Sequence, residues 1–296
     1  MKPPCIEVKD FSKAFGEFMA VDSLSFDVFP GEIFGFLGRN GAGKTTTIRT
    51  LLRIYEPDQG SLLLRSKPFH EGRAGEVGYL PEERGLYTRA KIWDTIIYLG
   101  RLRSVPLPLL KERAKELLNR FELWDLRNQK IQNLSSGMQQ KVQIISSLIH
   151  NPPILILDEP FRGLDPINRQ MVFELLKERK AAGVSILFSS HQILEVEDLC
   201  DRVIFIAEGK SRAYGTIDEV KRDFEPRIIS LTFDGTLPDL PDGCTIYDQG
   251  NRVEIRYPEE LEPQEILEQM VKSKVRIHRF EITRPSLHSI FLDLCA

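Results

Sequence analysis

Two kinds of hydrophobic spacing alternate along the first 220 residues of the chain. Short, largely apolar runs at 33–37, 154–157 and 184–188 have the composition of parallel strands that are buried on both faces. After the first of these runs, apolar residues recur every three or four positions over 45–55, and they recur in the same way over 142–149. Strands that alternate with helices in this way predict an α/β domain.

Other segments carry different patterns. Alternating apolar residues over 6–28 predict short antiparallel strands ahead of the first buried run. Helical spacing at 93–102 and 109–121 predicts a helical region that covers about 85–130.

The pattern changes at about residue 221, where the chain becomes poorer in glycine motifs and more acidic. Alternating strands, a helix that begins at Pro263, a strand over 275–282 and a last helix capped by Ser286 predict a small α+β unit. We therefore expect one large domain over 1–220 and an accessory domain over 221–296 that has no catalytic constellation of its own.

Composition narrows the class of protein. With 296 residues and 42% hydrophobic content, the chain is long enough for two domains that each have a core. A net charge of −3 gives no electrostatic reason to expect a nucleic-acid partner. The four cysteines lie far apart, and no apolar stretch is long enough to cross a membrane, so we expect a reduced protein in the cytoplasm.

A glycine-rich segment follows the first buried strand and opens a helix. It fits the phosphate-loop pattern G-x-x-x-x-G-K-[ST] at every defined position. Backbone N–H groups of such a loop surround the nucleotide phosphates, the helix dipole favours negative charge, and the lysine adds a point charge. The residues predicted to bind nucleotide are Gly38, Arg39, Asn40, Gly41, Ala42, Gly43, Lys44, Thr45 and Thr46.

Three further features leave alternatives open. Asp158 and Glu159 end a buried strand, at the sheet edge where ligands bind in α/β domains, but such a string is common by chance. His191 follows the next buried strand and could be a structural histidine. Phe15 precedes the phosphate loop and could stack on a base, although a single phenylalanine is more often part of a core.

Six motifs follow one another over 1–220. They are K-A-F-G at 13–16, the phosphate loop, L-S-S-G-M at 134–138, L-D-E-P at 157–160, G-L-D-P at 163–166 and S-H at 190–191. Their order resembles the nucleotide-binding subunit of ABC transporters, which implies a phosphate-loop NTPase fold with a mixed sheet, an antiparallel β subdomain and a helical subdomain. The tail is similar to the C-terminal extension of ABC-2-type export ATPases, such as the sodium-export and antibiotic-resistance subfamilies.

For the nucleotide, the resemblance implies ATP with Mg²⁺. Phe15 would stack on adenine, and Val21 would belong to the same nucleotide-binding set. Thr45 and Asp158 would hold Mg²⁺, directly or through water. Glu82 stands where the family usually has glutamine, so it would place an extra negative charge near the metal, unless it is a solvated loop carboxylate that pairs with Arg84.

For the reaction, the resemblance implies that Glu159 polarises the attacking water and that His191 holds this water and the γ-phosphate in line. Ser135 and Gly137 would bind the γ-phosphate of a nucleotide held by a second copy, and Asp165 would lie at the same dimer interface. Ser136 and Met138 depart from the usual signature residues.

We interpret the chain as an ATP-hydrolysing subunit that drives export. It would lie at the inner face of the cytoplasmic membrane, form a head-to-tail homodimer with ATP, and bind separate transmembrane permease subunits through the region about 85–130. One alternative is a soluble ABC-type ATPase that remodels a ribosome or a nucleic-acid complex. Another is a regulatory binding module without turnover, which the presence of both Glu159 and His191 disfavours.

Overall fold

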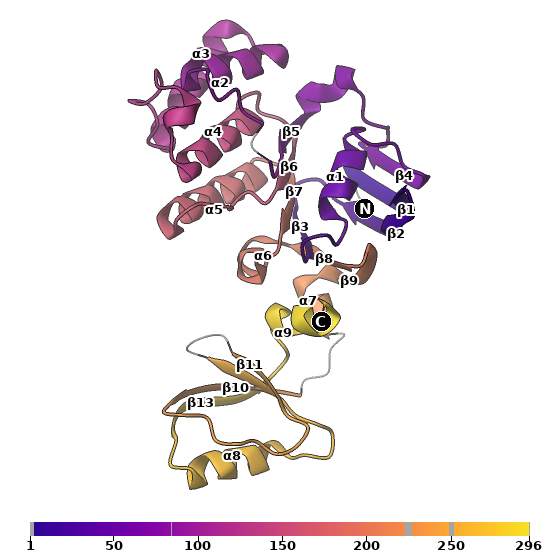
Figure 1. Ribbon diagram of the computed structural model, residues 1–296, viewed down its shortest axis with the longest axis vertical. Helices are drawn as coiled ribbons and strands as arrows, with labels where there is room; N and C mark the ends of the chain where they lie inside the picture. Colours follow the sequence, from indigo (N-terminus) through magenta and orange to yellow (C-terminus); the bar gives the residue numbers. More distant parts are fainter. Residues whose placement is uncertain (1–2, 84, 223–226, 249–251, 296) are drawn as a thin grey trace. The chain divides into compact units, whose positions relative to one another are not determined.

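The computed structural model describes residues 3–83, 85–222, 227–248 and 252–295. The chain divides into two compact units, Met1–Tyr214 and Gly215–Ala296 (Figure 1). The sequence pattern changes at about 221, slightly later than this division. None of the described helices is long and apolar enough to cross a membrane.

The first unit is built on a six-stranded sheet. Its strands lie in the order β5 (Val77–Leu80), β6 (Ile154–Asp158), β7 (Ser185–Ser190), β3 (Ile33–Gly38), β8 (Arg202–Ala207) and β9 (Lys210–Thr216). The first five of these strands pair in parallel. Every residue of β3, β6 and β7 is buried, which explains why β3 and β6 are largely apolar. The three buried serines of β7 form hydrogen bonds through their hydroxyl groups. The carboxyl ends of these three strands lead into the phosphate loop, Glu159 and His191.

A second, antiparallel sheet has the order β2 (Phe18–Val28), β1 (Ile6–Phe15), β4 (Gln59–Leu64). The predicted antiparallel strands over 6–28 are confirmed as the long hairpin β1–β2, whereas the sequence analysis did not identify β4. Phe26 of this sheet stacks on Phe34 of β3, with ring centroids 5.4 Å apart, so the two sheets share one core.

Helices complete the first unit. They are α1 (Lys44–Leu51), α2 (Ile92–Leu102), α3 (Leu107–Arg120), α4 (Ser136–Leu148), α5 (Pro166–Ala181) and α6 (Ile193–Leu199), with short 3₁₀ turns at Glu71–Glu76 and Ile131–Asn133. In Figure 1, α2, α3 and α4 lie on one side of the central strands and the antiparallel sheet lies on the other.

One helix prediction needs correction, and one helix was missed. The first helix ends at Leu51, not at Tyr55, because Arg53 has a left-handed backbone with φ of 56°. Helix α5 was not identified, although Asp165 caps it and Pro166 begins it, because the apolar spacing of that segment is weak.

The second unit is an α+β fold. Its four-stranded antiparallel sheet has the order β11 (Thr245–Asp248), β12 (Val253–Arg256), β10 (Ile228–Asp234), β13 (Arg276–Thr283), and its helices are α7 (Ile217–Arg222), α8 (Pro263–Lys272) and α9 (Leu287–Cys295). Ile266 and Met270 of α8 are fully buried in a core formed with the sheet. The predicted α/β domain, followed by a small α+β unit, is thus confirmed as the fold class.

Candidate nucleotide-binding site

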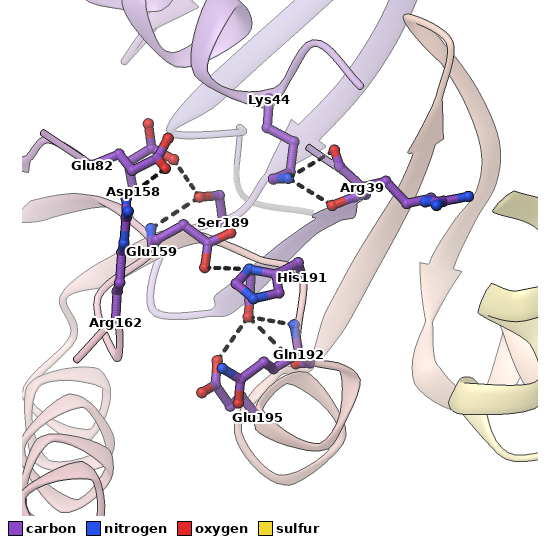
Figure 2. Close-up of polar contacts among 12 residues, drawn as sticks. Arg39, Lys44, Glu82, Asp158, Glu159, Arg162, Ser189, His191, Gln192 and Glu195 are labelled. Atoms are coloured by element: carbon purple, nitrogen blue, oxygen red, sulfur yellow. Dashed lines mark hydrogen bonds and ion pairs between the residues drawn. The ribbon is translucent and has the colours of Figure 1, made fainter. Parts of the chain in front are cut away.

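The phosphate loop connects β3 to α1 at the edge of the central sheet. Gly41 and Gly43 have φ of 83° and 104°, which favours glycine. A Cβ atom at Gly43 would lie 2.6 Å from the Ala20 carbonyl oxygen, so the backbone approaches β2 too closely for any side chain. The Lys44 ammonium donates hydrogen bonds to the carbonyl oxygens of Gly38 and Arg39, at 2.6 and 3.2 Å (Figure 2). This arrangement holds a buried positive charge against the loop.

A cavity of about 390 Å³ opens beside this loop. Aromatic side chains line one part of it, backbone groups of the loop line the next, and carboxylates line the third. The lining residues are Phe15, Phe18, Ala20, Asn40, Gly41, Ala42, Gly43, Lys44, Thr45, Thr46, Glu82, Asp158 and Glu159. The cavity therefore offers an aromatic surface, phosphate donors and hard oxygen ligands in one space.

The aromatic part of the cavity comes from the β1–β2 hairpin. Phe15 is 45% exposed, so it is not the core residue that the sequence left as an alternative. Its ring lies edge-on to Tyr55, at 5.3 Å between centroids. Phe18 pairs with Phe15 across the hairpin and is 64% exposed. The sequence analysis missed Phe18, which an exposed aromatic at a hairpin turn could have indicated.

Val21 occupies a different position from the other predicted nucleotide-binding residues. It is fully buried in the core and lies outside the set that lines the cavity. One of its methyl carbons would be 3.0 Å from a Cβ at Gly43. Val21 thus supports the phosphate loop from behind.

Thr45 and Asp158 meet although 113 positions separate them in sequence. The Thr45 hydroxyl donates a hydrogen bond to Oδ2 of Asp158 at 2.9 Å, and the Ser189 hydroxyl donates to Oδ1. Burial raises the pKa of Asp158, and these two hydrogen bonds oppose that shift. A carboxylate and a hydroxyl at the phosphate end of the cavity are the hard oxygen ligands that fit Mg²⁺. Within the described ranges, no three His, Cys, Asp or Glu side chains gather into an all-protein metal cage, and Mg²⁺ bound to a nucleotide does not need one.

Glu159 and His191 form the next pair. The His191 Nδ1 atom lies 2.9 Å from Oε2 of Glu159 (Figure 2). Glu159 is itself 8% exposed, has φ of 52°, and donates its backbone N–H to the Ser189 hydroxyl at 3.1 Å. Burial raises the pKa of Glu159, and the interaction with His191 opposes that shift. A buried, oriented carboxylate of this kind is suited to take a proton from water.

The segment after β7 is held by contacts that the sequence did not reveal. The Ser190 hydroxyl donates a hydrogen bond to the Glu195 carboxylate at 2.7 Å, and it accepts one from the backbone N–H of Gln192 at 2.9 Å (Figure 2). The backbone N–H of Gln192, the residue after His191, is therefore held in place, and β7 ends at the residue before His191. These contacts set the backbone position from which His191 reaches Glu159.

Glu82 also reaches the cavity. Its carboxylate accepts a hydrogen bond from Arg162 at 2.9 Å, whereas the neighbouring Glu83 pairs with Arg49 at 3.1 Å. Arg84, the partner that the sequence suggested, lies outside the described residues.

Ser135, Gly137 and Asp165 do not line this cavity. Ser135 is exposed and caps α4 by accepting a hydrogen bond from the N–H of Met138 at 3.3 Å. Asp165 is also exposed and caps α5 through the N–H of Asn168 at 2.9 Å. A Cβ at Gly137 would lie 3.1 Å from the Gly163 carbonyl oxygen, so the helix that Ser135 caps begins close to the turn before Asp165.

Comparison with known proteins decides the family. Residues 21–162 match the ABC transporter family profile, and residues 215–295 match that of the ATP-binding protein DrrA1-3-like C-terminal domain. The chain is 40% identical over 294 residues to the uncharacterized ABC transporter ATP-binding protein YhaQ of Bacillus subtilis, covering 97% of each protein. The chain belongs to the ABC transporter ATP-binding proteins.

Two more proteins are similar to this ABC subunit, one in sequence along nearly the whole chain and one in its solved structure. The linearmycin resistance ATP-binding protein LnrL of Bacillus subtilis is 29% identical over 304 residues, with 98% of this chain and 97% of the relative covered. A solved ATP-binding subunit of an ABC transporter superposes with a TM-score of 0.71 at 31% identity, covering 74% of this chain and 92% of the other. The expected ABC-type fold, nucleotide binding and ATP hydrolase activity are confirmed. Members of this family power transport by hydrolysing ATP, and this subunit is an ATPase of that kind.

Proposed function

We propose that this ABC ATPase powers export through separately encoded membrane-spanning subunits, at the cytoplasmic face of the membrane. The observation that carries the proposal is the C-terminal match over residues 215–295 to the DrrA1-3-like domain. The chain is similar to a linearmycin resistance ATP-binding protein along nearly its whole length and to a Nod factor export ATP-binding protein over 220 residues, and the second similarity supports outward transport.

Within the site, ATP would lie with its adenine against Phe15 and its phosphates over the loop and Lys44. Thr45 and Asp158 would hold Mg²⁺, which supplies positive charge to the phosphoryl oxygens when it is bound. Glu159 would accept a proton from the attacking water, and His191 would keep the Glu159 carboxylate in place. The 2.9 Å distances within both pairs support these roles.

A second copy of the chain would complete the site. Ser135, Gly137 and Asp165 are turned to solvent or lie at helix starts, outside the cavity of their own chain. Helix α4 begins directly after Ser135, so its N-terminal N–H groups and the serine hydroxyl are suited to bind a phosphate presented by the partner. This arrangement supports a head-to-tail homodimer that would hold two ATP molecules.

The membrane subunit would bind at α2. Tyr98 and Leu102 on this helix are 49% and 60% exposed, and Tyr87 packs edge-on to Tyr98 with centroids 6.0 Å apart. A groove of about 520 Å³ lies along this face, lined by Trp93, Asp94, Ile97, Tyr98, Arg101 and Leu102. Exposed aromatic side chains around a groove are suited to receive an apolar cytoplasmic segment of a membrane protein.

Co-expression with a candidate ABC-2-type membrane subunit tests the proposal. The ATPase should sediment with membranes only when that subunit is present, and membranes from these cells should transport a substrate outward when ATP is supplied on the cytoplasmic side. Tyr98→Glu should release the ATPase from membranes and leave nucleotide binding unchanged. Leu194→Glu on α6, at a residue that is 69% exposed, is the matched control and should remain bound. Membrane binding that is equal in both variants would exclude α2 as the docking face.

A further inference from the structure

The ion pair between Glu82 and Arg162 joins two loops at the nucleotide cavity. Glu82 follows β5, and Arg162 lies in the turn between β6 and α5. The Arg162 Nη1 atom donates to Oε1 of Glu82 at 2.9 Å (Figure 2). Glu82 also lines the cavity together with Thr45 and Asp158. One carboxylate thus faces both a guanidinium and the position proposed for Mg²⁺.

The neighbouring carboxylate does not share this position. Glu83 pairs with Arg49 of α1, and its carbonyl oxygen accepts a hydrogen bond from the buried amide of Gln143 at 3.2 Å. These contacts fix the backbone after Glu82 and direct the Glu83 side chain elsewhere. Glu83 is therefore a matched control that differs from Glu82 in its partner and in lying outside the cavity lining.

The Glu82–Arg162 pair is placed to exchange partners. The side chains of Arg162 and Glu82 are 63% and 38% exposed, and ion pairs at such exposure contribute little to stability. Mg²⁺ carries twice the charge of a guanidinium and prefers carboxylate oxygen. While Arg162 is paired with Glu82, its positive charge offsets the negative charge of the Glu82 carboxylate, which a glutamine at position 82 would not have.

We propose that Arg162 is a positioning residue that competes with Mg²⁺ for Glu82. This inference rests on the magnesium site of the proposed function. Glu82 would pair with Arg162 in the absence of the metal, and with Mg²⁺ bound it would be a ligand of the ion or of its water, which would release Arg162. Arg162 immediately precedes Gly163, which has φ of 74°, and the same turn leads to Asp165 at the start of α5. Metal binding would therefore free a positive charge in the segment that is proposed to meet the second copy.

Nucleotide affinity at graded Mg²⁺ concentrations tests the competition. A fluorescent ATP analogue is titrated into the full chain, Arg162→Gln, Glu82→Gln, the double variant and Glu83→Gln, first in EDTA and then at each Mg²⁺ concentration. Arg162→Gln should raise apparent Mg²⁺ affinity by about two- to fivefold, since it removes the competing cation. Glu82→Gln should lower this affinity, the double variant should match Glu82→Gln, and Glu83→Gln should match the unmodified chain.

The double variant separates competition from a general field effect. If Arg162→Gln changes Mg²⁺ affinity equally in the parental chain and in the Glu82→Gln background, or changes it in neither, the proposal is wrong. Binding in EDTA reports the ATP site independently of the metal. Loss of Mg²⁺ dependence in the unmodified chain would overturn the magnesium site and this inference together, whereas normal Mg²⁺ dependence with no effect of Arg162→Gln would overturn the inference alone. Thermal melting confirms that each variant is folded.

Discussion

The His191 imidazole contacts one oxygen of the Glu159 carboxylate, and the other oxygen is buried without a hydrogen-bond partner among the described residues. Nδ1 of His191 is 2.9 Å from Oε2, and Oε1 is the oxygen left without a partner in that part of the chain. A buried carboxylate oxygen without a hydrogen-bond donor lowers the stability of the folded protein. Such an atom in a native structure is often explained by a catalytic role. Under the proposed function, the contact with His191 would orient the carboxylate through Oε2, and Oε1 would be available to the attacking water.

Glu159→Gln should bind ATP and hydrolyse it slowly. The amide has nearly the same shape but cannot accept a proton, so turnover should fall by roughly 10²–10⁴-fold, the range of general base catalysis. Single-turnover hydrolysis and equilibrium binding of ATP measure the two effects separately. The variant should also accumulate as an ATP-bound dimer in light scattering. Hydrolysis at the parental rate would exclude Glu159 as the base.

His191→Ala should lower turnover largely through Glu159, because the imidazole holds this carboxylate. A double-mutant cycle measures the coupling. In the Glu159→Gln background, removal of the imidazole should cost much less than it costs alone. Fully multiplicative losses would show that His191 acts independently of Glu159, for example by contacting the phosphate only.

Two damaged copies should restore one working site. Lys44→Ala removes the phosphate-loop charge, and Ser135→Asp places a negative charge against the partner's γ-phosphate. Aspartate still caps α4 at this position, so the stability of Ser135→Asp should be unchanged. An equimolar mixture should hydrolyse ATP faster than the sum of the two separate variants, since half of the sites in mixed dimers are intact. A mixture no more active than that sum would contradict the shared site.

Truncation after Thr216 keeps all of β9 and removes the rest of the second unit. We expect ATP binding to persist, because every residue that lines the nucleotide cavity precedes this position. Dimer formation or membrane binding should weaken, as expected for an accessory domain. A folded truncation, verified by circular dichroism, that no longer binds ATP would contradict this assignment.

His150 should make the first unit less stable as pH falls. Its Nε2 donates to the Val77 carbonyl oxygen at 3.0 Å, its Nδ1 is buried without a partner among the described residues, and burial lowers its pKa to about 4. In the unfolded chain, His150 takes up a proton near pH 6.5. The free energy of unfolding should therefore decrease by about 1–2 kcal/mol as the pH falls from about 6.5 to 4. This amount is reduced because the His150 side chain is partly exposed to solvent. Urea unfolding of the full chain and of His150→Gln measures this difference. An identical pH dependence in both proteins would exclude the histidine as the cause.

Features that are contiguous in sequence could be predicted from the sequence alone. The phosphate loop is one uninterrupted segment whose glycines and lysine act through their own backbone and charge, so its composition predicts its chemistry. The buried strands were equally clear, because a strand covered on both faces is mainly apolar, apart from the polar residues at its ends. The acidic residues Asp158 and Glu159 directly follow one of these apolar runs, so their place at the carboxyl end of β6 could also be predicted.

Features that depend on strand order required the tertiary structure. Because β6 and β3 both pair with β7, the Asp158 carboxylate and the Thr45 hydroxyl come within 2.9 Å. In the sequence only the family resemblance connects these two residues, and no local pattern does. Strand β4 and helix α5 escaped prediction because their burial is one-sided and their patterns are weak. The ion pair between Glu82 and Arg162 likewise depends on where two separate loops end. The sequence alone determined which groups are available for phosphate chemistry. The packing of parallel strands decided which of these groups meet, because the order of the strands in the sheet, and not position along the chain, sets the distance between loop side chains.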